Sequence, residues 1–63
     1  MIDLKKLRVA KSLTQERLAE ECEVNRSTIS MIEIGVNKPS VELAKKLGSI
    51  FNVDWTLFFE DGE

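Results

Sequence analysis

The segment from Thr14 to Gly35 is TQERLAEECEVNRSTISMIEIG, and its pattern predicts two short helices that meet at a corner. Thr14 is a favourable N-cap residue, and apolar residues follow it at helical spacing. The pattern breaks at Glu23 and Val24, after which Asn25 offers a second N-cap and Gly35 a stop signal. The apolar residues of the two expected buried sides are Leu18, Ala19 and Cys22, then Ile29 and Ile32.

The same arrangement marks helix starts elsewhere in the chain. A potential N-cap has one apolar residue just before it and another four positions after it, and such a pair can form a hydrophobic staple. The four sets are Ile2-Asp3-Leu7, Leu13-Thr14-Leu18, Val24-Asn25-Ile29 and Val53-Asp54-Phe58. With Ser40 as a further cap, we expect helices at about 3–11, 15–22, 26–34, 41–51 and 55–60, followed by a fraying tail.

Length and composition point to one small all-α domain spanning residues 1–63. The net charge is −2, histidine is absent, and the single Cys22 fits a buried thiol. No metal-ligand cluster or nucleophile–base pair suggests an enzyme, and we expect no cofactor, metal or small-molecule ligand. No signal peptide or membrane span is evident, so we expect a cytoplasmic protein that does not bind membranes.

Two helices joined by a short turn form a helix-turn-helix motif, whose second helix can enter the major groove of DNA. With Ile29 and Ile32 inward, the opposite face of that helix carries small hydroxyl and apolar side chains beside Arg26. Such a face could pack against another part of the chain or a subunit. It could also read bases, since arginine grips guanine and methionine can touch thymine methyls. The candidate base-contacting residues on this face are Arg26, Ser27 and Met31.

Other residues suit the DNA backbone. Gln15 begins a helix whose unpaired N–H groups attract anions, and Asn37 and Lys38 occupy a loop that follows the second helix of the motif. These could equally be surface residues without a role. The candidate phosphate-contacting residues are Thr14, Gln15, Ser30, Asn37 and Lys38.

The last expected helix is apolar over a wide arc that includes Trp55 and Phe59. Two interpretations are compatible with this arc: a small core wraps around both rings, or the rings form a dimer or partner surface. Both interpretations remain open on the sequence alone.

These residues together resemble the Cro/cI-type helix-turn-helix domain of phage repressors and XRE-family regulators. The most specific pieces are Leu7-Arg8, Thr14-Gln15, Leu18-Ala19, Ile29-Ser30, Ile32-Glu33, Gly35 and Pro39-Ser40. The resemblance covers about residues 4–59 and implies a compact five-helix, lambda-repressor-like fold. It also implies that Gln15 and Lys38 contact the DNA backbone, and that Arg8 and Glu33 form an internal ion pair. The resemblance further implies base contacts, or contacts to nearby phosphates, and so adds one residue to the base-contacting candidates: the set is Asn25, Arg26, Ser27 and Met31.

The chain departs from the family pattern in three places. Glu23 stands where the family usually has glycine, and a left-handed conformation there would cost glutamate ~1–2 kcal/mol relative to glycine. Arg17 replaces the usual acidic residue of the capping box, and Met31 and Ile34 are unusually apolar.

The expected function is sequence-specific binding of double-stranded DNA by a homodimeric transcriptional regulator, expected to be a repressor. The alternative is a module of the same fold that binds a protein partner, such as an antitoxin or adaptor. The acidic balance, the apolar Met31 and Ile34, and the aromatic last helix favour that alternative.

Overall fold

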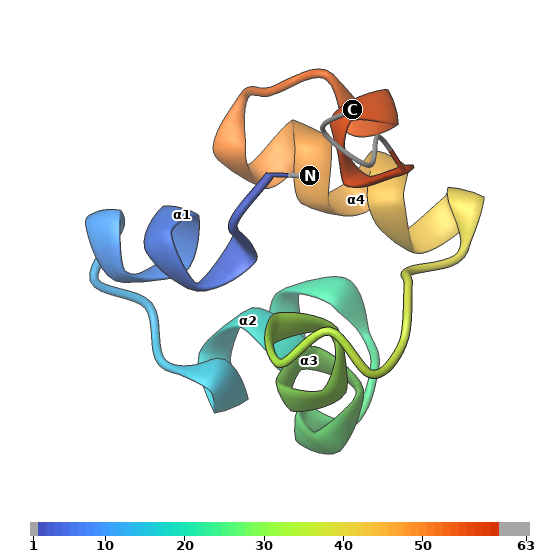
Figure 1. The fold of residues 1–63 in the computed structure, drawn as a ribbon. Coiled ribbons are helices and arrows are strands. Elements are labelled where there is room, and N and C mark those ends of the chain that lie inside the picture. The colour runs from blue at the N-terminus through green and yellow to red at the C-terminus, as the bar shows by residue number, and fades with distance from the viewer. Residues whose placement is uncertain (1, 60–63) are drawn as a thin grey trace.

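The computed structural model describes residues 2–59, and every regular element within that range is helical. The helices are α1 (Leu4–Ala10), α2 (Gln15–Cys22), α3 (Arg26–Glu33), α4 (Val41–Phe51) and the 3-10 helix η1 (Trp55–Phe59). In Figure 1, α2 and α3 lie together below, α4 and the red end of the chain lie above, and α1 lies to one side. The all-α prediction is therefore confirmed.

The fifth element differs from expectation, because it is a five-residue 3-10 helix and not an α-helix. Asp54 accepts hydrogen bonds from the backbone and hydroxyl of Thr56, and the Leu57 N–H bonds to the Asp54 carbonyl three residues back. Tight i→i+3 bonding suits so short a segment. Phe58 still points inward, with 2% of its surface exposed. The expected extension to residue 60 and the fraying tail lie outside the described residues.

Most of the predicted N-caps form. The side chains of Asp3, Thr14 and Ser40 each accept a hydrogen bond from the backbone N–H three residues later. Asn25 occupies the N-cap position of α3, but its side chain makes no cap hydrogen bond. Ala10, which α-helical spacing could place inward, is exposed because α1 is only two turns long and ends there.

The α-helices also end in the same way, and the sequence did not indicate that they share one type of ending. Each α-helix is followed by a residue with positive φ: Ser12, Glu23, Gly35 or Asn52. The N–H of the next residue then bonds to a carbonyl five positions back, which defines a Schellman motif. These bonds run from Leu13 to Arg8, Val24 to Ala19, Val36 to Met31 and Val53 to Gly48, at 2.9–3.0 Å. Leu13, Val24 and Val53 thus complete one helix end and occupy the first position of the next predicted staple.

We expect Glu23→Gly to raise the free energy of unfolding by about 1 kcal/mol, because Glu23 adopts φ 60° and ψ 40°. The ion pair that the variant loses, Glu23 to Lys46 at 3.3 Å, is 82% exposed on the glutamate side, so screening limits its contribution. Urea melts of the two proteins would measure the difference.

Glu23→Ala is the matched control, since it loses the same ion pair and keeps a side chain in the left-handed conformation. It should not stabilise. Asn52→Gly should gain little, because asparagine tolerates this conformation. An equal gain from Glu23→Ala and Glu23→Gly would contradict the conformational explanation.

A single core joins the helices. Its fully enclosed side chains are Leu18, Cys22, Ile29, Leu47 and Phe58. Burial raises the pKa of the Cys22 thiol above its ordinary value, partly offset by the charge of Lys46, so this thiol stays protonated and shielded. The longest helix in residues 2–59 has 11 residues, and none there is long and apolar enough to cross a membrane.

Candidate nucleic-acid interface

The corner between α2 and α3 is held by backbone bonds and by a lysine from α4. The N–H groups of Glu23 and Val24 bond to carbonyls in the last turn of α2. Lys46 donates to the Cys22 carbonyl and to the Glu23 carboxylate, both at 3.3 Å. A cation placed at the carboxyl end of a helix also complements the helix dipole. These contacts fix the direction in which α3 leaves α2.

The outward face of α3 is the one expected from the sequence. Ile29 is fully buried and Ile32 is 7% exposed, which turns the opposite side of α3 away from the core. The Arg26 side chain has no hydrogen-bond or ion-pair partner among the described residues, and the Asn25 side-chain amide makes no hydrogen bond to the backbone of α3. The outward side chains are Arg26, Ser27, Met31 and, at the C-cap, Ile34, while Ser30 is half-buried.

Three candidate contact residues surround one cleft. Thr14, Gln15 and Arg26 line an open hollow of about 370 Å³ together with Arg8 and Glu16. The cleft lies at the N-terminus of α2, where backbone N–H groups lack helical partners and attract anions. The Thr14 hydroxyl oxygen accepts the Arg17 N–H at 3.0 Å, which leaves its hydrogen available as a donor. Donors suited to a phosphate thus meet in this cleft, which the Glu16 carboxylate also borders.

The remaining backbone candidates lie apart from this cleft. Asn37 and Lys38 line a second hollow of about 350 Å³, which also borders Thr28 and Ile32 of α3 and the start of α4. Both residues are exposed. The structure therefore divides the candidate residues between two hollows, and does not gather them at one point.

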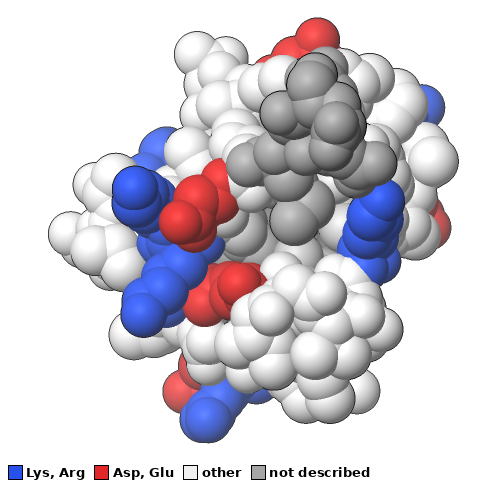
Figure 2. All heavy atoms as spheres, viewed as in Figure 1, with Lys and Arg blue, Asp and Glu red and all other residues white. Residues whose placement is uncertain are grey.

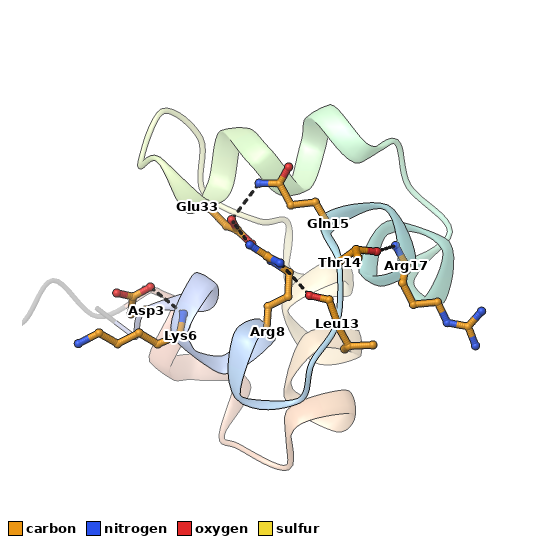
Figure 3. A network of polar contacts seen from close by, with 8 residues as sticks. All are labelled: Asp3, Lys6, Arg8, Leu13, Thr14, Gln15, Arg17 and Glu33. Atoms are coloured by element: carbon orange, nitrogen blue, oxygen red, sulfur yellow. Dashed lines mark hydrogen bonds and ion pairs between the residues drawn. The ribbon is translucent and has the colours of Figure 1, made fainter.

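A cluster of polar side chains ties α1, α2 and α3 together (Figure 3). Arg8 Nε donates to Glu33 Oε2 at 2.6 Å, with 12% of the arginine side chain and 4% of the glutamate side chain exposed. Arg8 also donates to the Leu13 carbonyl at 2.7 Å. The ion pair that the family resemblance implied is thus present.

Gln15 belongs to the same cluster, which the sequence did not reveal. Its Nε2 donates to Glu33 Oε1 at 3.0 Å. The two residues are 18 positions apart, so helical spacing alone gives no sign that they meet. The chemical type of Gln15 was informative, but its internal partner was not predictable without the fold.

The surface around α3 has little charge of either sign. Figure 2 shows acidic and basic groups mixed at the left of the molecule and a basic patch at the right edge, with a largely uncharged area below that patch at the lower right. Met31, Ile34 and Val36 contribute exposed apolar surface there, at 40%, 69% and 62%. On α2, Arg17 pairs with Glu20 and Glu21, so it adds little free positive charge.

Trp55 and Phe59 are half-buried and pack against the core. Their rings meet edge to face at 6.1 Å, and the Lys45 ammonium lies 5.3 Å from the centroid of the Trp55 ring. Part of the surface of each ring is therefore already in contact with other side chains of the same molecule.

Residues 2–59 contain no group of three side chains suited to hold a metal ion.

Comparison with known proteins agrees with this geometry. A helix-turn-helix family model matches residues 4–58. The chain is 48% identical over 58 residues to the uncharacterized HTH-type transcriptional regulator YqaF of Bacillus subtilis, covering 92% of this chain and 76% of that protein. It is 42% identical over 62 residues to the uncharacterized HTH-type transcriptional regulator MJ0272 of Methanocaldococcus jannaschii. This match covers 95% of this chain and 94% of that protein.

A third relative is much longer than this chain. The chain is 44% identical over 50 residues to the HTH-type transcriptional activator BcrR of Enterococcus faecalis. The matched region covers 79% of this chain but only 24% of that protein. No solved structure matches the chain significantly. The family match over most of the chain and the shared helix-turn-helix fold lead to one conclusion: the chain belongs to the XRE-type helix-turn-helix family.

Proposed function

We propose that this protein is a transcriptional regulator that binds double-stranded DNA as a homodimer, with α3 in the major groove, and that it acts as a repressor. The observation that carries the proposal is the outward face of α3, where Arg26 has no partner among the described residues, beside the donor-lined cleft of Thr14 and Gln15. Arg26 and Asn25 lie at the amino end of α3, from which recognition helices commonly reach base edges.

In this proposal the candidate residues have two kinds of role. Asn25, Arg26, Ser27 and Met31 read bases, whereas Thr14, Gln15, Ser30, Asn37 and Lys38 hold the backbone. Contacts to phosphates set the register of a protein on the duplex, and contacts to base edges carry the sequence information. The backbone candidates lie in two separate hollows, Thr14 and Gln15 in one and Asn37 and Lys38 in the other, which would suit two separate sets of phosphate contacts.

Arg26→Ala should lower affinity for the preferred duplex about tenfold and relax the choice of one base pair, expected to contain guanine. Lys38→Ala should weaken specific and non-specific duplexes alike, and should reduce the slope of log affinity on log salt by about one per subunit. Selection from a random duplex pool would supply the site. Titrations of single-base variants across a salt series would then separate the two effects.

Both side chains are exposed, so both variants should retain the helical content of the wild type, which circular dichroism would check. If Arg26→Ala weakens every sequence equally, Arg26 contacts phosphate and base choice lies with its neighbours. If neither substitution changes affinity, α3 does not read the groove.

For the dimer, Trp55 and Phe59 are the candidate contact residues. If their exposed parts form the interface, the melting midpoint should rise with protein concentration, and Trp55→Ala should remove that dependence. The midpoint itself will also fall in this variant, because Trp55 packs on the core. The concentration dependence is therefore the relevant measurement, and a wild-type monomer in concentrated sedimentation runs would exclude a stable dimer through these rings.

A protein-binding module is the second candidate, favoured by the exposed Met31, Ile34 and Val36 and the net charge of −2. Failure of the wild type to bind mixed duplex DNA at low salt would favour it over DNA recognition.

A further inference from the structure

Glu33 holds more than an ion pair. Its two carboxylate oxygens accept three hydrogen bonds from side chains of α1 and α2: Arg8 Nε at 2.6 Å, Arg8 Nη2 at 3.3 Å and Gln15 Nε2 at 3.0 Å (Figure 3). Only 4% of the Glu33 side chain is exposed. A carboxylate so enclosed has few alternative positions, so it is a fixed reference point for the groups that donate to it.

The contact determines how the Gln15 amide is turned. Only the NH₂ end of an amide can face a carboxylate, because the carbonyl end would be repelled. One of the two hydrogens on Nε2 is used by Glu33, and the other remains as a donor. Gln15 also lines the cleft at the N-terminus of α2, with Thr14 and Arg26. Its side chain is thus ordered before any ligand arrives. Because ordering a glutamine on binding carries an entropic cost, this arrangement lowers that cost.

Arg8 makes this arrangement compatible with an anionic ligand. A carboxylate near a DNA phosphate would repel it, but the Arg8 guanidinium compensates the charge of Glu33. Arg8 also donates to the Leu13 carbonyl, next to the Thr14 cap. The charge compensation and the start of α2 therefore depend on the same side chain.

We propose that Glu33 is a positioning residue for DNA binding: it fixes the Gln15 amide so that its second Nε2 hydrogen donates to a DNA phosphate. This inference rests on the proposed function, because it requires a duplex at the cleft. It assigns to Glu33, which does not itself contact DNA, an effect on affinity that passes through Gln15.

A double-mutant cycle on DNA affinity tests the proposal. Glu33→Ala alone could unfold the domain by leaving Arg8 without its partner, so the background is the paired variant Arg8→Met/Glu33→Met, which removes both charges and keeps similar volume. Gln15→Ala is then measured in the wild type and in that background. The matched control background is Arg17→Met/Glu21→Met, which removes an exposed ion pair of α2 at 3.1 Å.

In the wild type and in the control background, Gln15→Ala should lower affinity for the selected duplex about tenfold, as expected for loss of a charge-assisted hydrogen bond. In the Arg8→Met/Glu33→Met background the same change should cost less than about threefold, because Gln15 is no longer held. A purely structural role for Glu33 predicts an equal cost in all three backgrounds, and that result would overturn the inference while leaving DNA binding intact.

An NMR measurement without DNA supplies the second readout. The side-chain amide of Gln15 should be ordered in the wild type and should show the mobility of an exposed glutamine in the Arg8→Met/Glu33→Met variant. A mobile Gln15 amide in the wild type would overturn the inference. Absence of any duplex binding by the wild type would overturn the proposed function and this inference with it.

Discussion

Gly48→Val should destabilise the domain by more than ~3 kcal/mol, which is a large part of the stability of a chain this short. A Cβ at Gly48 would lie 2.8 Å from the Val53 carbonyl oxygen and 3.1 Å from the Cβ of Trp55. These neighbours cannot move away easily, because the Val53 N–H bonds to the Gly48 carbonyl at 2.9 Å in the turn that ends α4. The close approach of α4 to the chain before η1 therefore requires glycine.

Ser49→Val is the control, since Ser49 is the next residue of α4, is exposed, and serine and valine have similar helix propensities. It should change stability by less than ~0.5 kcal/mol. Gly48→Ala should fall between the two, because the helix propensity of alanine offsets part of the steric cost. Thermal melts would show Gly48→Val more than about 12 °C below the control. Similar midpoints for Gly48→Val and Ser49→Val would mean that α4 and the chain before η1 can separate without cost.

Local chemistry explains why the helix starts were predictable. An N-cap and a staple act over six consecutive positions, so their whole mechanism is visible in the sequence. The bounds of α2 and α4 agree with expectation, and α3 ends one residue earlier. Family resemblance identified Glu23 as a position where a left-handed conformation would be costly, and the structure has Glu23 at φ 60°.

Features that depend on distant contacts were not predictable. Nothing local marks Ser12 as left-handed, although it ends α1 as Glu23 ends α2. Gly48 lies within a helical pattern, and only the position of Trp55 explains why it is glycine. The bond from Gln15 to Glu33 joins two helices whose packing is a property of the whole fold. For the same reason the residues proposed to contact DNA were chosen by chemical type and position, and not by their partners.

Glu33→Ala should lower the free energy of unfolding by about 2–3 kcal/mol, more than an exposed charge change does. Removing one partner of a fully buried ion pair commonly costs ~3–5 kcal/mol, because the other charge is left uncompensated. The cost here should be smaller because 12% of the Arg8 side chain reaches solvent. Gln15 also loses its acceptor, and the ion pair between α1 and α3 disappears.

The exposed pair of Arg17 and Glu21 provides the comparison. Its atoms approach to 3.1 Å, but 61% and 43% of the side chains are exposed, so Glu21→Ala should cost less than ~0.5 kcal/mol. The replacement Arg8→Met/Glu33→Met should recover most of the stability lost in Glu33→Ala, since two apolar side chains leave no buried charge unpaired. Urea melts of the four proteins would measure all three differences.

If Glu33→Ala costs no more than Glu21→Ala, water compensates Arg8 in the variant, and the ion pair does not hold α1 against α3. If the paired replacement is as unstable as Glu33→Ala, the loss comes from the hydrogen bonds to Gln15 and Leu13, and not from an unpaired charge.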